Sequence, residues 1–189
     1  NLAAAIRKAP EIVGQIGKVV LMGGALTVPG NVSAWAEANI SQDPDAADEV
    51  FRSGVPATMV GLDVTLQTLL TRKETEQWRQ LGNAAGRFLA DMTDFYIKAY
   101  ETTAPGLGGC GLHDPLAVGV AIDPTLVATL PINMQTDVEG ATRGRTIGDP
   151  DKLNDPRKTM QVAVGVDAPR FLGEFMTRIT NVARSAKAE

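Results

Sequence analysis

The chain has 189 residues, 44% of them hydrophobic and 21% charged, which is long enough for one soluble domain with a buried core. Its formal net charge of −4, without a stripe of lysines or arginines, gives no electrostatic reason to expect a nucleic-acid partner. No apolar run is long enough to span a membrane, no signal peptide is visible, and the single cysteine fits a reducing compartment, so we expect a cytoplasmic protein without a membrane partner.

The first half of the chain alternates helices with apolar strands. Residues 1–9 predict a short helix, and residues 18–24 form an apolar run closed by glycines, which is typical of a strand buried on both faces. Residues 43–54 predict a helix with Asp43 as its N-cap, followed by a second buried strand over 56–65.

The second half begins with three more predicted helices, over 72–82, 84–101 and 114–122. Two strands of a hairpin, a further strand and a closing amphipathic helix follow, over 126–137, 143–149, 160–167 and 168–186. This order predicts an α/β fold with an open, largely parallel sheet and flanking helices. Because no internal repeat or linker appears, we expect a single domain.

The loop after the first strand is the first candidate site. Its glycines are not spaced as Gly-x-Gly-x-x-Gly, and Pro29 argues against a helix opening there, so a dinucleotide site is disfavoured. Open α/β sheets nevertheless bind ligands at the carboxyl ends of their parallel strands. Asn31, Glu37 and Asn39 in this loop offer the donors and acceptors that a polyhydroxylated ligand needs, although a polar loop making its own turns explains them more simply.

A stripe of large side chains on the long helix is the second candidate. Phe88, Met92, Tyr96 and Tyr100 recur every four residues and therefore share one face. Such a stripe is usually core. The alternative is that the two tyrosines border a pocket, with a ring stacked on a flat ligand.

The third candidate is the segment GGCGLHDPLAVGV, residues 108–120, which holds the only histidine and the only cysteine. The glycines before His113 allow close backbone approach to a ligand. Asp114 could be an oxygen ligand for a hard cation or only the N-cap of another Asp-Pro helix start. The residues by themselves leave both interpretations open.

These motifs occur together in one family. The segments VLMGGA leading to GN, AEANISQDPDAADEVF, TMVGLDVT and GLHDPLAV resemble, in order and spacing, the inosine-uridine preferring nucleoside hydrolases. The likeness covers nearly the whole chain, and the combination is far more specific than any one piece. It implies a Rossmann-like open α/β domain that binds Ca²⁺ in its active site and hydrolyses the N-glycosidic bond of a ribonucleoside to ribose and free base.

The resemblance also implies a role for each candidate residue. Asp114 would be a calcium ligand that meets ribose hydroxyls, and His113 would protonate the leaving base. The other residues would bind the nucleoside: Asn39 the ribose near the metal, Asn31 and Glu37 its 5′-hydroxyl, Met22 the sugar, and Tyr96 and Tyr100 the base. This division fits the chemistry, because calcium takes about six to eight oxygen ligands and the departing base gains electrons and needs a proton.

The sequence departs from the family pattern at two places. The family's AEFN reads AEAN, with Ala38 in place of an aromatic residue near the base, so the base preference stays open. The family's amino-terminal aspartate cluster, which supplies the other metal carboxylates and the base that activates water, does not occur in residues 1–189. We therefore expect the carboxyl-terminal portion of a single nucleoside hydrolase domain, incomplete and inactive on its own.

Two other functions remain open. The chain could be a non-catalytic nucleoside- or ribose-binding protein, in which Asn31, Glu37 and Asn39 would matter and His113 would not. It could also be a structural fragment completed by another chain. For the complete protein we expect a homo-oligomer, either a dimer or a tetramer, acting on small-molecule ribonucleosides.

Overall fold

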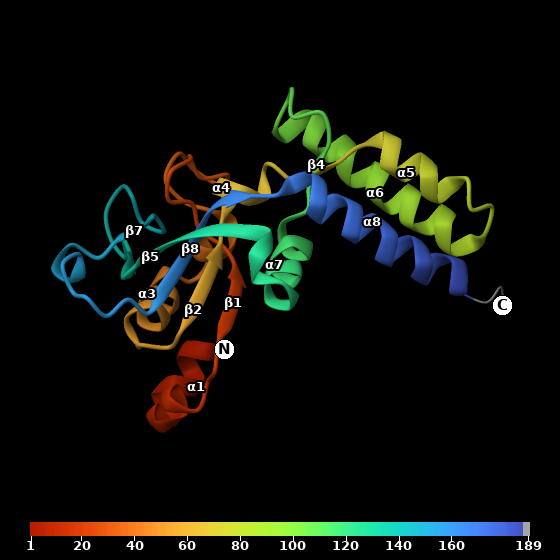
Figure 1. Cartoon of the computed structure of the whole chain (residues 1–189). Coiled ribbons are helices and arrows are strands. Elements are labelled where there is room, and N and C mark those ends of the chain that lie inside the picture. Colours follow the sequence, from red (N-terminus) through yellow and green to blue (C-terminus); the bar gives the residue numbers. More distant parts are fainter. Residues whose placement is uncertain (187–189) are drawn as a thin grey trace.

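The computed structural model describes residues 1–186 and has a four-stranded sheet at its centre (Figure 1). The strand order is β1 (Val19–Met22), β2 (Ala57–Val60), β8 (Met160–Val166) and β5 (Val127–Ile132). The first three strands run parallel, and β5 pairs antiparallel with β8 at the edge. An open, largely parallel sheet with flanking helices confirms the predicted fold class.

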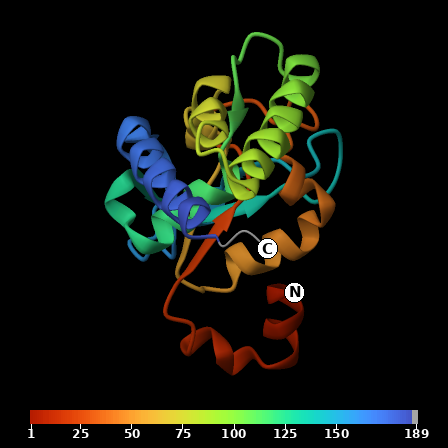
Figure 2. The same cartoon turned by 90° about the vertical axis from the view of Figure 1, so that its right-hand side faces the viewer.

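The remaining elements lie around the sheet or, like α5 (Arg72–Arg79), α6 (Ala84–Thr103) and α8 (Ala168–Ser185), extend together to one side of it (Figure 1). The other α-helices are α1 (Leu2–Lys8), α2 (Ala38–Gln42), α3 (Pro44–Arg52), α4 (Leu62–Thr65) and α7 (His113–Ile122). Short 3₁₀ helices are η1 (Pro10–Gly14), η2 (Pro124–Leu126) and η3 (Pro150–Lys152), and the small strands are β3 (Leu69–Leu70), β4 (Cys110–Gly111), β6 (Met134–Thr136) and β7 (Thr146–Gly148). Figure 2 shows α6 and α8 in front of the sheet, and α5 packs with both.

Helix α3 begins and ends where the sequence predicts. The Asp43 carboxylate accepts a hydrogen bond from the backbone N–H of Ala46 at 3.0 Å, and Pro44 occupies the first helical position. Gly54 follows the helix with a φ of +87°, a conformation that favours glycine. The cap, the proline and the glycine together fix this helix, so its predicted range is confirmed to within two residues.

Of the two strands predicted as buried, the first is not buried, and the second is buried but shorter than predicted. Strand β1 is only half-buried, because it lies at the edge of the sheet and, within residues 1–186, pairs with β2 alone. The second predicted strand, 56–65, ends at Val60, and its last residues form α4. The chain turns at Gly61, where the next N–H, that of Leu62, donates to the carbonyl of Gly24 at 2.9 Å.

The predicted hairpin between 126–137 and 143–149 is confirmed only for the end of its first segment. Residues 126–137 form two strands instead of one: β5 joins the main sheet, whereas β6 pairs antiparallel with β7. The break falls at Asn133, whose buried side chain donates to the carbonyl of Arg157 at 3.0 Å and accepts from the N–H of Thr159 at 3.2 Å. These bonds to a distant segment turn the chain out of the sheet.

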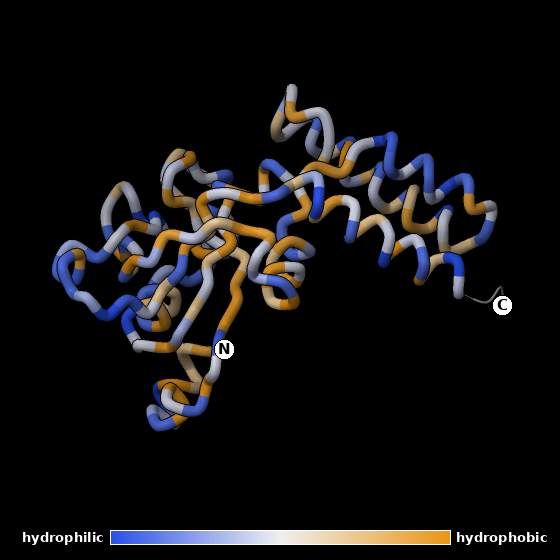
Figure 3. Tube along the Cα trace, viewed as in Figure 1, coloured by the Kyte–Doolittle hydropathy of each residue, from blue (hydrophilic) through white to orange (hydrophobic). Residues whose placement is uncertain are grey.

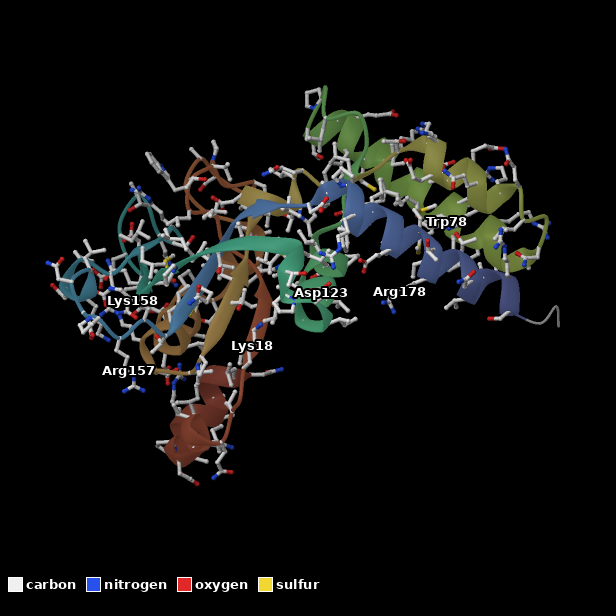
Figure 4. The ribbon with its side chains drawn as sticks, viewed as in Figure 1. Lys18, Trp78, Asp123, Arg157, Lys158 and Arg178 are labelled. Atoms are coloured by element: carbon white, nitrogen blue, oxygen red, sulfur yellow. The ribbon has the colours of Figure 1, made fainter. Side chains whose placement is uncertain are left out.

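The core lies between the sheet and its helices, and Figure 3 shows hydrophobic residues concentrated along the strands. Trp78, labelled in Figure 4, joins α5 to α8: its indole N–H donates to Thr180 Oγ1 at 3.0 Å, and its ring packs edge-on against Phe175. Within residues 1–186, no helix has the length and hydropathy that crossing a bilayer requires.

The stripe on α6 is mostly outside this core. Phe88, Met92 and Tyr96 are 66%, 52% and 46% exposed, so core packing is the wrong interpretation for these three, while Tyr100 is half-buried. The buried face of α6 consists instead of Gly86, Ala90, Thr93 and Ile97. Small residues there let the helix approach its neighbours closely, which turns the larger side chains outward.

Candidate active site

One cavity of about 180 Å³ collects every predicted site residue. It lies at the carboxyl end of β1, and its lining comes from β1, the loop and helix that follow, α6 and α7. The lining residues are Met22, Asn31, Glu37, Ala38, Asn39, Tyr96, Tyr100, His113 and Asp114. Of two larger hollows, one of about 520 Å³ shares Tyr100 with this cavity and one of about 820 Å³ shares Asp114, but neither contains the imidazole or the two amides. The roles of these residues stay predictions.

Glu37 shapes the cavity as well as lining it. Its side chain is 2% exposed, and its carboxylate accepts backbone N–H groups from Gly24 at 2.9 Å, Asn39 at 2.8 Å and Ile40 at 3.1 Å. The last two bonds cap α2, and the first ties that helix to the end of β1. Since a carboxylate has about four lone-pair sites, about one is left for a ligand.

Asn31 and Asn39 lie on the exposed rim. Asn31 Oδ1 accepts the N–H of Ala38 at 2.9 Å, as the loop-turn interpretation requires. Asn39 Nδ2 donates to the carbonyl of Met22 at 3.3 Å and contacts its sulfur at 3.1 Å. Within the described chain, the Asn31 amide NH₂ and the Asn39 carbonyl oxygen have no protein partner. One donor group and one acceptor therefore face a ligand.

His113 is the first residue of α7, and both ring nitrogens are hydrogen-bonded. Nδ1 lies 2.7 Å from Thr65 Oγ1, and Nε2 lies 2.6 Å from the Tyr100 hydroxyl, which is itself 3.5 Å from the Tyr96 hydroxyl. Burial lowers the pKa of His113 below its usual 6.5, although Asp114 and Glu37 oppose that shift. Burial, followed by the Tyr96 hydrogen bond, raises the pKa of Tyr100 far above its usual value, so its phenol stays neutral.

Asp114 is not an N-cap. Helix α7 begins one residue earlier, Leu112 holds the cap position, and no side chain caps this helix. The Asp114 carboxylate is exposed and makes no hydrogen bond to any residue in 1–186. It is therefore a carboxylate at the cavity that the fold does not use.

The described residues do not form a calcium site by themselves. Calcium requires about six to eight oxygen ligands. Residues 1–186 contain no cluster of three or more histidine, cysteine, aspartate or glutamate side chains that could hold a metal ion. At the cavity, Asp114 offers one unengaged carboxylate, and that of Glu37 is largely occupied by backbone N–H groups.

Two residues that sequence reasoning missed support the site from α4. The carboxylate of Asp63, 5% exposed, accepts N–H groups from Leu26 at 2.9 Å and Thr27 at 2.6 Å and so anchors the loop after β1. Thr65 is the partner of His113 Nδ1. Both belong to the segment GLDVT, whose polar residues at the end of a buried strand are the signal that could have found them.

The sequence of this chain matches a known protein family. The family model for inosine-uridine preferring nucleoside hydrolases matches residues 1–173. The chain is similar to the pyrimidine-specific ribonucleoside hydrolase RihA of Shigella boydii, at 34% identity over 180 residues, covering 95% of this chain and 58% of RihA.

Solved structures of nucleoside hydrolases are also similar to this chain. A purine-preferring ribonucleoside hydrolase from Gardnerella vaginalis is 78% identical with a TM-score of 0.95, covering 98% of this chain and 58% of that one. The plant nucleoside hydrolase PpNRh1 is 32% identical with a TM-score of 0.85, covering 95% and 58%. The chain thus spans 58% of the length of each of these relatives.

Proposed function

Because the chain belongs to the inosine-uridine preferring nucleoside hydrolase family, we propose that it carries the nucleoside-binding and proton-donating part of an active site that hydrolyses ribonucleosides to ribose and free base. The observation that supports this most is the single cavity that gathers an imidazole, two tyrosines, two amides and a free carboxylate from four separate elements. Such a convergence of polar groups at a strand end suits a ligand better than a structural role.

His113 is the proton donor in this proposal. Cleavage of an N-glycosidic bond builds positive charge on the sugar while electrons move onto the base. The imidazole lies beside Tyr100 at the cavity wall, where a proton can pass to a departing nitrogen. A pKa lowered by burial makes the imidazolium a stronger acid but leaves less of it protonated at neutral pH. The donor step is therefore favoured on the acidic side of neutrality.

The other residues hold the two halves of the substrate. The Asn31 amide and the Asn39 carbonyl, with the remaining acceptor of Glu37, match the hydroxyls of a ribose, which both donate and accept. The rings of Tyr96 and Tyr100, packed edge-on with centroids 5.0 Å apart, offer aromatic surface to a flat base.

Purine nucleosides are the proposed substrates. The protein from Gardnerella vaginalis, 78% identical, is named purine-preferring, whereas the Shigella boydii relative, 34% identical, is named pyrimidine-specific. Ala38 lines the cavity with a single methyl group, which leaves space for a bicyclic base.

In this proposal Asp114 would be one ligand of a calcium ion. Its free carboxylate is the kind of hard oxygen ligand that the ion prefers, but one such group does not hold it. The chain spans 58% of the length of its relatives, so the other ligands would have to come from further residues of a full-length protein. We expect residues 1–189 alone neither to bind calcium tightly nor to hydrolyse nucleosides.

The experiment is to measure base release from inosine and uridine by a full-length protein that contains this chain, with calcium present. We expect hydrolysis, faster for inosine. Asn39→Ala should slow both substrates, and Gln77→Ala, outside the cavity on α5, is the matched control that should slow neither. Full activity in both Asn39→Ala and His113→Ala would place the active site elsewhere.

A further inference from the structure

The histidine ring of the cavity is held from three directions. Its two nitrogens contact Thr65 Oγ1 and the Tyr100 hydroxyl, at 2.7 and 2.6 Å. A Cβ built on Gly111 would lie 2.6 Å from Nε2 and 2.8 Å from Cε1, so the backbone of β4 lies against the ring. A rotated ring would lose both hydrogen bonds, so this orientation is well defined.

Thr65 is more deeply buried than His113, and its backbone is held by hydrogen bonds within α4 and to the residues that follow. It is 0% exposed and ends α4, where its N–H donates to the carbonyl of Gly61 at 3.1 Å. Its own carbonyl accepts the hydroxyl of Thr68 at 3.0 Å. Among residues 1–186, His113 is the one hydrogen-bond partner of Thr65 Oγ1. The hydroxyl is thus a rigid group aimed at Nδ1.

The chemistry of the two hydroxyls decides the direction of each bond. A neutral imidazole carries one N–H donor and one acceptor nitrogen. A phenol is more acidic than an aliphatic alcohol, so it is the stronger donor and the weaker acceptor. The lower-energy arrangement has Tyr100 donating to Nε2, while the N–H of Nδ1 donates to Thr65 Oγ1.

We propose that Thr65 is a positioning residue that holds His113 in the Nδ1–H tautomer, with Nε2 turned toward Tyr100 and the cavity. This assignment stands on the geometry of the three side chains. Its catalytic consequence rests on the proposed function, in which the imidazolium, protonated at both nitrogens, gives its Nε2 proton to the departing nitrogen of the base and becomes the neutral ring that keeps Nδ1–H. The Thr65 hydroxyl accepts the N–H of Nδ1 before and after that transfer, so it stabilises the form of the ring that the transfer leaves.

The chain allows a direct test, because its single histidine gives a single pair of ring-nitrogen signals. In ¹⁵N-labelled residues 1–189 at about pH 8.5, roughly two units above the ordinary imidazole pKa, the ring is neutral and ¹⁵N shifts distinguish a protonated from an unprotonated nitrogen. We expect Nδ1 to be protonated. Thr65→Val keeps the side-chain shape without the hydroxyl, and its major tautomer should become Nε2–H.

Thr65→Ser is the matched control, since it keeps the hydroxyl and removes only a methyl group. It should retain the Nδ1–H tautomer. Three results would overturn the proposal: Nε2–H in the unaltered chain, an unchanged tautomer in Thr65→Val, or the same change in Thr65→Ser. The first and third can be read even if Thr65→Val does not fold.

Kinetics of the full-length protein separate this inference from the proposed function. There, Thr65→Val should lower kcat about 10- to 100-fold, part of the roughly 10²–10⁴-fold contribution of a positioned general acid, with KM little changed. Thr65→Ser should restore most of the rate. Absence of base release by the unaltered protein would refute the proposed function and leave the tautomer result standing, whereas base release with an unchanged tautomer in Thr65→Val would refute this inference alone.

Discussion

Most polar side chains in the cavity make hydrogen bonds within the protein, but that of Asp114 makes none to the described residues. Glu37 accepts three backbone N–H groups, whereas the Asp114 carboxylate accepts none from residues 1–186. The same type of group is therefore structural at one position and available at the other. This difference gives separate expectations for the two carboxylates.

Replacing Glu37 should destabilise the fold. In Glu37→Gln the amide NH₂ would face backbone N–H groups in a buried site, so we expect a loss of about 1–3 kcal/mol in the free energy of unfolding, measured with urea. Asp43→Asn is the control, because Asp43 accepts one N–H at an exposed N-cap, where asparagine caps about equally well. Equal losses in both variants would contradict the buried-cap role of Glu37.

Asp114→Asn should leave stability unchanged, because the carboxylate caps no helix. We expect a change of less than about 0.5 kcal/mol in the free energy of unfolding, the usual range for a surface substitution. In the full-length protein the same variant should lose calcium affinity and activity together, as measured by calorimetry and base release. Normal calcium dependence would show that Asp114 is not a metal ligand.

The buried imidazole should make stability depend on pH. Because burial lowers the pKa of His113 in the folded chain below the value of the unfolded chain, the unfolded state binds more protons between the two values. This contribution to stability is complete above about pH 6.5 and is lost as the pH falls through the folded pKa. Urea unfolding at about pH 7.5 and pH 5.5 should show the loss. His113→Gln should reduce it, and a folded pKa at or above 6.5 by NMR titration would contradict this account.

At the scale of elements, the sequence predicts those whose ends carry their own signals. Helices α3 and α8 follow the N-caps Asp43 and Asp167, whose carboxylates accept N–H groups of the first turn. The residues that line the cavity were predictable as a group because the motifs keep the family's order and spacing, whereas their roles stay predictions. Both kinds of signal are contained in short stretches of sequence, so no knowledge of distant contacts was needed.

The features that could not be predicted depend on distant contacts. The split between β5 and β6 is set by Asn133, whose partners lie at Arg157 and Thr159. The period of four on α6 shows that four side chains share a face, but not which face packs on α8. The bond from Thr65 to His113 joins residues 48 positions apart.

The turn from β2 into α4 should tolerate no side chain. A Cβ on Gly61 would lie 2.7 Å from the carbonyl oxygen of Gly24, a backbone atom that cannot move alone. Gly61→Ala should therefore cost about 1–3 kcal/mol in the free energy of unfolding. Gly173→Ala, where a Cβ meets nothing within 4 Å in the interior of α8, should be neutral or stabilising. Similar unfolding midpoints for the two variants would refute the close approach.

At the scale of the whole molecule, exposed apolar surface adjoins the cavity. Strand β1 is half-buried at the edge of the sheet, and the neighbouring helix α7 exposes Val118 by 60% and Ile122 by 66%. A groove of about 820 Å³ between α7 and α8 continues this surface, and Asp114 borders both it and the cavity. The chain spans 58% of the length of its relatives, so activity is properly measured on a full-length protein.

The most direct test of the active-site assignment compares two substrates in the full-length protein. His113→Ala should slow the hydrolysis of inosine by roughly 10²–10⁴-fold, because the base leaves poorly without a proton. A ribose carrying 4-nitrophenolate, which leaves readily without one, should be cleaved almost normally. Asn39→Ala is the control and should slow both substrates alike, since both contain ribose. A ratio of the two rate losses near one for His113→Ala would contradict the proton-donor role.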